Sequence, residues 1–402
     1  MKILILNSGS SSVKYQLLDM PGGTRMASGD VTRIGMSAAV LAHKPYDRPE
    51  VKISAEILDH IMAIEYVVTM LLSPNHGVIK DKAEIEAIGH RVVHGGEAFA
   101  DSALITTEVL AKIRECIELA PLHNPHNLRG INACKKILPD VPQVGVFDTA
   151  LYQKMPKYAY IYALPYILYK KYQIRRYGFH GMSHFFVSRR ASQILNTPLA
   201  DMKVITTHLG NGCSISAFDG GKAVDTSMGF TPLEGLVMGT RCGDIDPAII
   251  LNIMGREELS LHEANTLLNK HSGLQGISGV SSDMRDILKG AESGNELAQL
   301  ALEIYCYRIR KYIGSFSAAM GGLDCLVFTA GVGENSPDVR KLVCEKLGYL
   351  GIELDPARNA ETIKKENIIS TDSGRVKVMA IPTNEELIIA EDTYNIVKEM
   401  KD

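Results

Sequence analysis

Short apolar runs alternate with segments of helical period along this chain, which is typical of proteins that combine a sheet with covering helices. Each run is bounded by polar residues, Gly or Pro, as expected of a strand. The predicted strands are Ile3–Leu6, Val13–Leu18, Gln143–Phe147, Val204–Thr207, Ser214–Phe218, Cys325–Thr329 and Val376–Ile381.

Between these runs, apolar residues recur at spacings of three and four, the pattern of a helix with one buried face. One helix is marked by Ile57, Ile61, Ile64, Val68 and Leu71, and a longer one by Leu297, Leu300, Ile304 and Ile313. Pro121 and Pro139 are expected to end two more helices, over Glu108–Ala120 and Leu128–Leu138. The sum of these elements predicts an α/β fold.

Two segments about two hundred residues apart, Ile3–Asp19 and Val204–Gly221, repeat one pattern: an apolar strand, a turn of Gly, Ser and Asn, and a second strand. Gly and Asn accept a positive φ, and small side chains let backbone N–H groups approach an anion. One such hairpin is usually structural, but two indicate a duplicated domain with a phosphate-facing loop in each half.

A third glycine-rich loop, Ala330–Ser336, follows the strand Cys325–Thr329 and is expected to open a helix at Ser336-Pro337. The free N–H groups and the dipole at such a helix start favour an anion or a polar ligand edge. Neither a Walker A sequence nor a complete Rossmann fingerprint occurs, so a nucleotide site depends on these loops together.

Composition excludes several function classes. The 402 residues correspond to roughly two or three domains, or one large one. With 43 Lys and Arg against 46 Asp and Glu, the net charge of −3 provides no cationic field for nucleic acid or an anionic membrane. Trp is absent and aromatics are only 6%, which argues against base stacking. Phosphate chemistry must therefore depend on local sites.

The cysteines and the N-terminus indicate a soluble, cytoplasmic protein. The seven cysteines are odd in number and contain no Cys-x-x-Cys pair, so we expect core residues in a reducing compartment. Met1–Leu6 is too short for a signal peptide, and no run approaches the ~18 apolar residues of a membrane span.

Six motifs together resemble the acetate and propionate kinase family, from Lys2 to the C-terminal helix. They are NSGSSSVK (Asn7–Lys14), RRYGFHGMSH (Arg175–His184), THLGNGCS (Thr207–Ser214), DTSMGFTPLEGLVMGTRCGDID (Asp225–Asp246), TAGVGENS (Thr329–Ser336) and IPTNEE (Ile381–Glu386).

This resemblance implies the duplicated ribonuclease-H-like fold that is shared by actin, hexokinase and Hsp70 ATPase domains. Residues 1–150 with the helix 386–402 would form one lobe, holding the acyl substrate, and 151–385 a nucleotide-binding lobe. The implied reaction is reversible, direct transfer of a phosphoryl group from ATP to acetate, giving acetyl phosphate and ADP. Mg²⁺, with Mn²⁺ as a substitute, and a homodimer are also implied.

A carboxylate acceptor has a pKa near ~4.3, so it is ionised at neutral pH and needs no general base. Catalysis should then consist of positioning and of stabilising charge on the transferring group. Arg91 and Arg241 are candidates because guanidinium forks match carboxylate and phosphate oxygens; the alternative is two surface salt bridges. By resemblance, Arg91 binds the acyl substrate and Arg241 steadies the transition state.

By resemblance, His180 hydrogen-bonds the transferring phosphoryl group. His180 and His184 also have the spacing of a zinc pair, but Gly181 stands where the motif HExxH needs its Glu. His90 and His94 share this spacing and are interpreted as packing or loop-fixing residues.

Asp148 follows a strand, where functional side chains of α/β sheets gather. The family pattern makes it a proton donor or acceptor; we expect it mainly to hold Mg²⁺-bound water or to orient Arg241, and the alternative is a helix cap. Asn7 and Glu385 are the magnesium ligands by resemblance, and the adjacent Glu386 offers the same chemistry.

The remaining site residues are assigned by resemblance. Nucleotide contacts are Ser10, Ser12 and Lys14; His208, Leu209, Gly210, Asn211 and Gly212; Asp283, Met284 and Arg285; and Gly331, Val332, Gly333, Glu334 and Asn335. The acyl methyl group is surrounded by Val93, Leu122, Phe179 and Pro232, with Arg91 at its carboxylate.

By the same resemblance, the Val93 side chain favours acetate over propionate as the substrate. A methylene in an apolar pocket is worth only ~1 to 3 kcal/mol, so propionate should still react more weakly. The alternatives are a kinase for propionate or another short-chain acid, and an actin- or Hsp70-like ATPase that acts as a switch.

Overall fold

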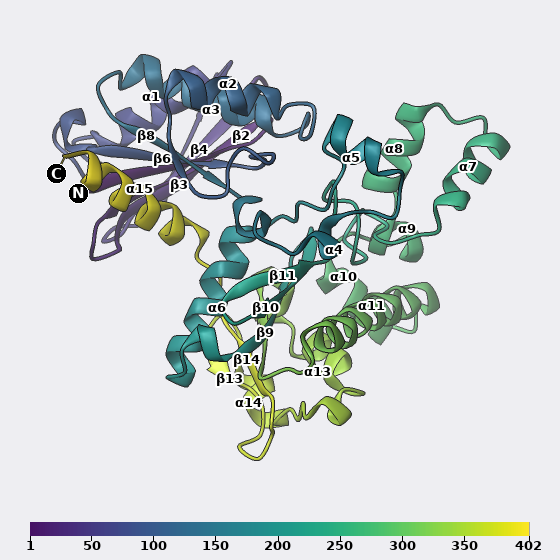
Figure 1. Ribbon diagram of the computed structural model, residues 1–402. Helices are drawn as coiled ribbons and strands as arrows, with labels where there is room; N and C mark the ends of the chain where they lie inside the picture. The colour runs from purple at the N-terminus through teal and green to yellow at the C-terminus, as the bar shows by residue number, and fades with distance from the viewer. Residues whose placement is uncertain (402) are drawn as a thin grey trace. The chain divides into compact units, whose positions relative to one another are not determined.

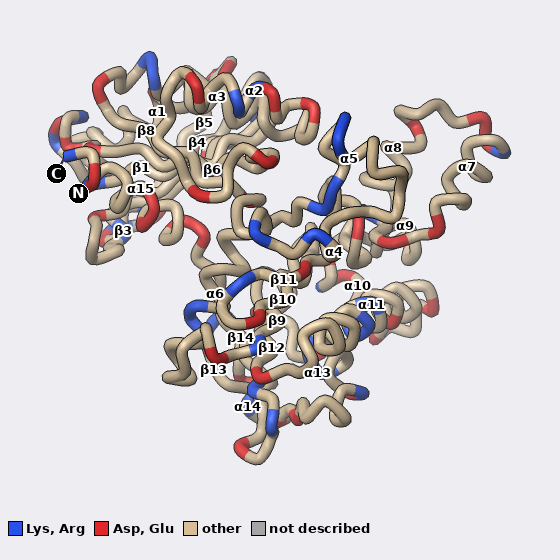
Figure 2. Tube along the Cα trace, in the orientation of Figure 1, with Lys and Arg blue, Asp and Glu red and all other residues tan. Residues whose placement is uncertain are grey.

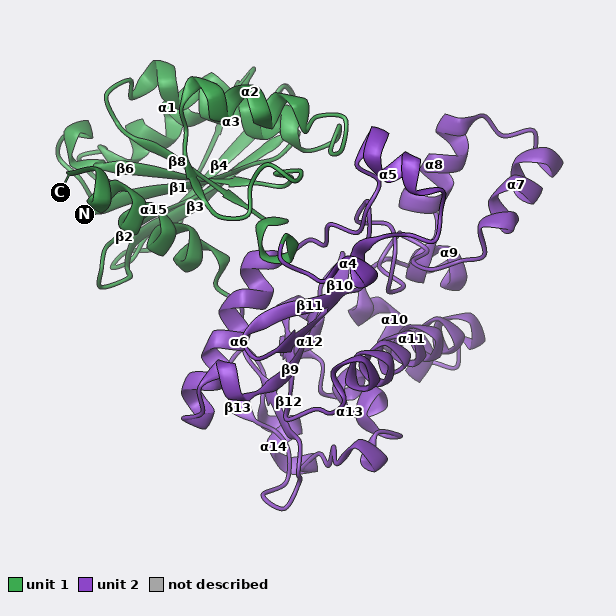
Figure 3. Ribbon diagram, viewed as in Figure 1, with its two compact units in different colours: residues 1–153, 384–402 green, residues 154–383 purple. Residues whose placement is uncertain are grey.

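The computed structural model describes residues 1–401 and confirms the α/β class (Figure 1). The chain divides into two compact units (Figure 3). Unit 1 comprises residues 1–153 and 384–402, and unit 2 comprises residues 154–383.

Unit 1 is built on an eight-stranded sheet with the order β5-β4-β3-β2-β1-β6-β8-β7. Its strands are β1 (Lys2–Ser8), β2 (Ser12–Asp19), β3 (Thr24–Thr32), β4 (Ala39–Pro45), β5 (Val51–Ala55), β6 (Ala87–Val92), β7 (Ala103–Leu104) and β8 (Gln143–Phe147). Its helices are α1 (His60–Leu71), α2 (Thr107–Glu115), α3 (Asn124–Ile137) and α15 (Glu385–Lys401), with 3₁₀ turns η1 (Lys82–Glu84) and η2 (Ala150–Tyr152).

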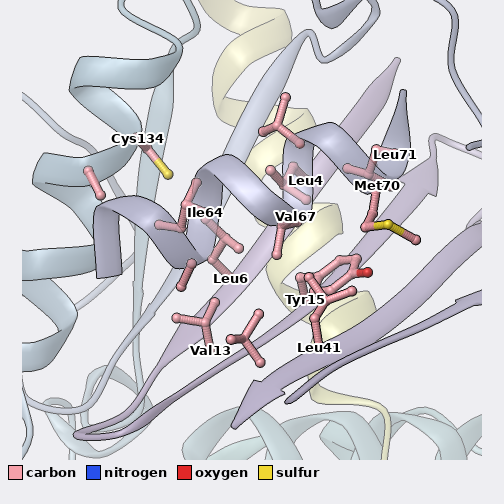
Figure 4. Close-up of a cluster of buried hydrophobic side chains, with 14 of the residues drawn as sticks. Leu4, Leu6, Val13, Tyr15, Leu41, Ile64, Val67, Met70, Leu71 and Cys134 are labelled. Atoms are coloured by element: carbon pink, nitrogen blue, oxygen red, sulfur yellow. The ribbon is translucent and has the colours of Figure 1, made fainter. Parts of the chain in front are cut away.

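Alternation along β1 separates the two faces of this sheet. Leu4 and Leu6 belong to a buried cluster with Ile64 and Val67 of α1 (Figure 4). Burying each such side chain contributes roughly 1.5–3 kcal/mol. Between them along the strand, Ile5 lines a cavity on the other face, which α15 contacts along β1, β6 and β8. That second face is the one that carries the polar candidates described below.

Unit 2 contains a six-stranded sheet with the order β11-β10-β9-β12-β14-β13. Its strands are β9 (Lys203–Leu209), β10 (Cys213–Asp219), β11 (Lys222–Thr226), β12 (Cys325–Thr329), β13 (Asn367–Ile368) and β14 (Lys377–Ala380). Its helices are α4 (Lys157–Tyr160), α5 (Tyr166–Tyr172), α6 (Gly181–Leu195), α7 (Pro247–Arg256), α8 (Leu261–Lys270), α9 (Gly273–Ser278), α10 (Met284–Glu292), α11 (Glu296–Met320), α12 (Ala330–Asn335), α13 (Pro337–Cys344) and α14 (Pro356–Glu361), with 3₁₀ turns η3 (Leu199–Asp201) and η4 (Gly348–Leu350).

The two sheets share one topology, which confirms the duplication that the hairpins predicted. In unit 1 the antiparallel strands β3-β2-β1 continue into the parallel series β1-β6-β8. In unit 2 the antiparallel strands β11-β10-β9 continue into the parallel series β9-β12-β14. Each unit therefore brings a hairpin turn and the carboxyl ends of parallel strands to one edge of its sheet.

All seven predicted strands are confirmed, but several helix predictions were wrong in detail. In α11, Leu297 and Leu300 are 53% and 44% exposed, because the buried face runs instead through Ala298, Leu302 and Tyr305. That face contains Ala and Tyr, whereas the prediction considered only large aliphatic residues.

Two helix boundaries and one loop also differ from the prediction. Helix α2 ends at Glu115, well before Pro121, and α3 begins at Asn124 rather than Leu128 because Pro125 occupies its first turn, where a missing N–H costs nothing. The predicted glycine loop at 330–335 is itself the helix α12; Ser336 caps α13, as expected.

The cysteines and the charged residues are distributed as the sequence composition led us to expect. Six cysteines are buried, Cys242 is partly exposed, and all seven have free thiols. Basic and acidic residues are interspersed along the trace of both units (Figure 2). Among the described residues, no helix combines the length and apolar character needed to cross a bilayer.

His90 is buried on β6, with Nε2 2.8 Å from the side-chain amide of Gln143, so its packing role is confirmed. Burial lowers the pKa of His90 to about 4. The folded protein therefore keeps a neutral ring while the unfolded chain takes up a proton as the pH falls below about 6.5. The stability that depends on the neutral ring is lost between about pH 6.5 and pH 4.

His90→Gln should make stability less sensitive to acid, because glutamine keeps a hydrogen-bonding side chain and does not titrate. Between pH 7 and pH 4, the variant should lose up to roughly 3 kcal/mol less unfolding free energy than the parent protein. Urea unfolding at both pH values measures this difference, and parallel losses in the two proteins would contradict it.

Candidate functional site

Unit 1 contains a cavity of about 230 Å³ on the α15 side of its sheet. Of the residues predicted from the sequence, it brings together Asn7, Lys14, Arg91, Glu385 and Glu386. Asn7 and Lys14 face each other across the first hairpin because they are paired in the β1–β2 register. Glu385 and Glu386 begin α15, so the two ends of the chain meet here.

Arg91, which lines this cavity, forms an ion pair with Asp148. Nε of Arg91 donates to Oδ1 of Asp148 at 3.1 Å and Nη2 donates to Oδ2 at 2.6 Å, a two-pronged geometry. The Asp148 side chain is only 2% exposed, and Arg91 is 21% exposed. Burial opposes the charged guanidinium, but the charges of Asp148 and Glu385 raise the pKa of Arg91 above its ordinary value. Arg91 therefore keeps its charge in the site.

Within unit 1, Asp148 holds Arg91, a contact that the sequence did not predict. The prediction that Asp148 holds Mg²⁺-bound water or orients Arg241 stays a prediction, whereas the helix-cap alternative was wrong, because Thr149 stands at the start of η2. Parallel pairing of β6 with β8 explains the contact with Arg91, because it sets Arg91 beside Val146, close to the end of β8 that Asp148 follows.

Glu385 places a carboxylate in this cavity, among other acidic side chains. Its Oε2 lies 4.0 Å from Nε of Arg91. Burial raises the pKa of Glu385; Arg91 opposes this effect, and the nearby Asp148 and Glu386 add to it. The cavity is lined by more acidic side chains than basic ones: Asp30, Glu50, Glu385 and Glu386 against Lys14, Lys44 and Arg91.

The donor set of unit 1 fits Mg²⁺. The side-chain oxygens of Asn7, Glu385 and Glu386 are hard ligands, and Mg²⁺ usually takes few protein ligands and completes its shell with water and phosphate. The described residues contain no group of three or more His, Cys, Asp or Glu arranged to hold a metal by themselves. A metal here would therefore depend on its substrate for ligands.

Two asparagines that the sequence analysis missed fix the end of β6. Asn127 Oδ1 accepts from the N–H of Val93 at 3.1 Å, and its Nδ2 donates to the carbonyl of Ser8 at 3.0 Å. Asn124 Oδ1 accepts from the N–H of His94 at 3.2 Å. Both lie in the first two turns of α3, within the segment whose start was predicted four residues late. Val93 is 9% exposed, whereas Leu122 is 67% exposed in the turn before α3.

The predicted residues of the first hairpin do not all line the same cavity. Ser10 lines a different cavity of about 480 Å³, with His60 and Arg129, and is separated there from Lys14. His60 Nε2 lies 2.7 Å from the carbonyl of Gly9, which anchors the turn. Ser12 opens β2, and its carbonyl accepts from the N–H of Gly9.

In unit 2, His180, Gly212 and Arg241 lie together. A Cβ built on Gly212 would stand 3.4 Å from Nη1 of Arg241 and 3.7 Å from Cε1 of His180, so the glycine keeps backbone close to both side chains. Nη1 of Arg241 also donates to the carbonyl of Pro232 at 3.2 Å. Burial lowers the pKa of Arg241 below its usual value, which is still far above neutrality.

Ser214 links the two histidines that the sequence analysis had weighed as a zinc pair. His180 Nδ1 lies 2.9 Å from Ser214 Oγ, and His184 Nε2 lies 2.7 Å from the same oxygen. The ring of His180 also stacks on His208, with centroids 4.1 Å apart. Phe179, which precedes His180, is buried. The His180 ring is thus fixed by neighbours on two sides.

Unit 2 contains a cavity of about 770 Å³, which brings together residues from the three predicted nucleotide segments of that unit. It is lined by Gly210, Asn211, Asp283, Met284, Arg285, Gly331, Val332 and Asn335. It also contains residues that the sequence analysis missed, among them Tyr305, Leu288, Ile363 and Lys364. Asp283 also has a structural role, because it caps α10.

Of the predicted nucleotide residues in unit 2, five do not line this cavity: His208, Leu209, Gly212, Gly333 and Glu334. His208 belongs to the stacked histidines, and Leu209 is fully buried. Glu334 Oε1 accepts from the N–H of Thr383 at 3.0 Å.

Arg340 supports the cavity from behind. It is fully buried, and its hydrogen-bond partners are neutral: Nη1 donates to the carbonyl of Gly333, Nε to Asn359 Oδ1, and Nη2 to the carbonyls of Asn359 and Thr362, at 2.7–2.8 Å. Burial lowers the pKa of Arg340 to about 10, so it remains charged at neutral pH. It thereby ties α12 to the segment that leads to Ile363.

The sequence matches the model of the acetokinase family over residues 2–391. It is 57% identical to the acetate kinase of Halothermothrix orenii over 399 residues, covering 99% of this chain and 100% of that protein. It is 54% identical to the acetate kinase of Thermoanaerobacter pseudethanolicus over 402 residues, with full coverage of both.

Solved structures give the same picture. The Porphyromonas gingivalis acetate kinase superposes with a TM-score of 0.95 at 49% identity, covering 98% of this chain and 99% of that one. A propionate kinase from Francisella tularensis superposes with a TM-score of 0.91 at 43% identity, covering 98% and 99%.

Proposed function

This chain belongs to the acetokinase family, and we propose that its two units carry out reversible transfer of a phosphoryl group from ATP to acetate, giving acetyl phosphate and ADP. The enzyme is a phosphotransferase with a carboxyl group as acceptor. Family membership favours this reaction over an actin- or Hsp70-like ATPase switch.

The observation that carries the proposal is the fork between Arg91 and Asp148. Asp148 takes one edge of the guanidinium, through Nε and Nη2. The remaining edge offers Nη1 and the second Nη2 hydrogen to the carboxylate of acetate. Because that carboxylate is already ionised, no proton has to be removed before it attacks the γ-phosphorus. Asp148 then orients Arg91, and a role for it as a base is not needed.

Arg241 and His180 suit the transferring phosphoryl group. In an in-line transfer, charge spreads over the equatorial oxygens, and donors that are already fixed stabilise it at the lowest cost. Gly212 lets its backbone approach the same region as the Arg241 guanidinium and the His180 ring.

The nucleotide occupies the cavity of unit 2 in this proposal. Its base and ribose would lie among Met284, Gly331 and Asn335, with the phosphates directed along the turn at Gly210 and Asn211. Small residues are needed there for close approach. In unit 1, Lys14 is the remaining cation for a nucleotide phosphate.

Asn7 and Glu385 would hold Mg²⁺, or Mn²⁺ in its place, with Glu386 as a second carboxylate. When bound, the cation offsets the negative charge of the phosphates. Unit 1, residues 1–153 and 384–402, would thus supply Arg91 and the metal contacts, and unit 2, residues 154–383, the cavity for the nucleotide. The seven free thiols support a reducing, cytoplasmic location.

An acyl-acid series tests the proposal. Acetate with ATP should yield acetyl phosphate, trapped as the hydroxamate, and propionate should react with a kcat/KM roughly 10- to 200-fold lower because of the Val93 side chain. ATP turnover without acetate-dependent hydroxamate would exclude the kinase, and a preference for propionate would exclude acetate as the substrate.

Arg91→Ala and Arg241→Ala should each reduce kcat at least about a hundredfold, since each removes donors that stabilise charge in the transition state. Arg91→Lys is the matched control for charge, because it keeps a cation near Asp148 but lacks the fork. Circular dichroism of each variant checks folding. Near-wild-type rates from either alanine variant would contradict the assignment.

A homodimer is supported by an apolar surface on unit 2. None of the residues of α7 is buried, and Ile249 and Leu251 are 46% and 74% exposed. Ile167 on α5 and Leu261 on α8 are 65% and 81% exposed. Exposed apolar patches mark interaction sites, and a second copy of the chain is the partner that we propose.

Leu251→Glu should convert the dimer to a monomer, because a carboxylate would have to be buried in the interface. Light scattering after gel filtration measures the mass. Leu297→Glu on α11, where the side chain is 53% exposed, is the matched control and should remain dimeric. A monomeric parent protein, or a dimeric Leu251→Glu, would contradict the proposal.

A further inference from the structure

The segment that carries Pro232 and Arg241 has no regular structure of its own. Residues 227–246 lie between β11 and α7 without a helix or strand. A connection of this length needs side chains to hold it in one conformation. What fixes it also fixes the guanidinium of Arg241, because Nη1 of Arg241 donates to the carbonyl of Pro232 in the same segment.

Three side chains outside the predicted substrate contacts hold this segment: Arg176, Glu234 and Tyr162, which we call the brace. Nη2 of Arg176 donates to Oε1 of Glu234 at 2.7 Å, and Nη1 donates to the carbonyl of Thr226 at 2.8 Å. The other carboxylate oxygen of Glu234 accepts from the hydroxyl of Tyr162. That hydroxyl in turn accepts from the N–H of Phe230 at 2.8 Å.

The brace is sheltered and charged. The side chains of Arg176 and Glu234 are 19% and 29% exposed. Burial alone would lower the pKa of Arg176, but the Glu234 carboxylate raises it above its ordinary value. Burial, together with the same carboxylate, raises the pKa of Tyr162. The hydroxyl therefore stays protonated and able to donate to Glu234 at neutral pH.

Gly229 shows how closely the brace is packed. A Cβ at this position would overlap both the carboxylate of Glu234 and the hydroxyl of Tyr162. The carbonyl of Gly229 accepts from the N–H of Tyr177 at 3.0 Å. Any larger residue at 229 would therefore force the pair apart.

The brace connects two functional segments of unit 2. Arg176 lies four residues before His180, on the stretch that ends at Phe179 and His180, whereas Glu234 lies two residues after Pro232. At the far end of the loop, the N–H of Gly235 donates to Oδ1 of Asp244 at 2.8 Å. A shift of Glu234 would thus move the Pro232 carbonyl that holds Arg241, and the apolar wall at Pro232 with it.

We propose that Arg176, Glu234 and Tyr162 are positioning residues that set Arg241 for transfer and set the size of the acyl pocket at Pro232. This inference rests on the proposed function, which assigns Arg241 its role, and on the family resemblance, which places Pro232 beside the acyl group. It extends that function to acyl-chain selectivity, which would depend on a brace that touches no substrate.

Glu234→Gln is the direct test, since it keeps the shape of the side chain and removes the charge that faces Arg176. With acetate, kcat should fall about tenfold or more, while KM for ATP stays unchanged because the nucleotide cavity contains no brace residue. The ratio of kcat/KM for acetate to that for propionate should also fall at least about threefold, because the wall at Pro232 loosens.

Tyr162→Phe provides a second variant that keeps the ion pair and removes the two hydrogen bonds of the hydroxyl, the one donated to Glu234 and the one accepted from the N–H of Phe230. It should shift kcat and selectivity in the same direction by a smaller factor, and the double variant should lose less than the product of the two factors. Glu366→Gln is the matched control, because Glu366 pairs with Arg190 at 2.6 Å on the surface of the same unit. Its kinetics should equal those of the parent protein.

The outcomes separate this inference from the proposed function. Absence of acetyl hydroxamate with the parent protein would contradict the proposed function itself. An active parent with unchanged kcat and selectivity in Glu234→Gln and Tyr162→Phe would overturn only the brace. Equal losses for acetate and propionate, together with a raised KM for ATP and a lower melting temperature, would also overturn it by showing a general structural role.

Discussion

A partly exposed guanidinium held by a buried carboxylate is the interaction on which the rest of this site depends. Asp148 is 2% exposed, and an ionised carboxylate at such a position is costly unless it is paired and hydrogen-bonded. The two-pronged contact with Arg91 meets that requirement and fixes the direction of the guanidinium. In the proposed function, the same pair leaves one edge of Arg91 for a substrate anion, so that stability and substrate capture would share one contact.

Two arginines of unit 2 are held differently from Arg91. Arg241 and Arg340 have neutral hydrogen-bond partners, carbonyls above all, rather than a carboxylate. A neutral partner orients a guanidinium without cancelling its charge, so in the proposed function the positive field of Arg241 would remain available to a phosphoryl group. This division agrees with the proposed chemistry, in which two anions must meet: one unit would place a cation beside the acceptor, and the other would keep a cation for the transferring group. A net charge of −3 is no obstacle when the cations are local.

Much of the fold could be predicted from the sequence because its signals are local. Strands such as Gln143–Phe147 are continuous apolar runs, and the repeated hairpin at Ile3–Asp19 and Val204–Gly221 carries its own turn chemistry. Helix faces were harder, since Ala298 and Tyr305 rather than Leu297 and Leu300 line the buried side of α11. Pro125 was overlooked as a helix start although Pro337 was recognised as one, because the apolar spacing that marked this helix begins only at Leu128.

For a related reason, the sequence predicted many residues of the candidate site but not which of them are partners. Motifs identify residue types, but a partner is set by strand pairing, which is non-local: the β6–β8 register gives Asp148 to Arg91. Asn127 and Arg176 were missed because a side chain that holds backbone carbonyls has no spacing signature. Ser10 was grouped with Lys14 by sequence distance, although the turn at Gly9 directs the two into different cavities.

The most direct test of this account asks whether Asp148 acts through Arg91 or by itself. A double-mutant cycle of Asp148→Asn and Arg91→Ala, measured as kcat/KM for acetate, separates the two roles. If Asp148 orients Arg91, Asp148→Asn should lower kcat/KM strongly in the parent protein and by less than about threefold once Arg91 is already alanine. An equal loss from Asp148→Asn in both backgrounds would contradict the account, because it would mean that Asp148 acts on the substrates independently of Arg91.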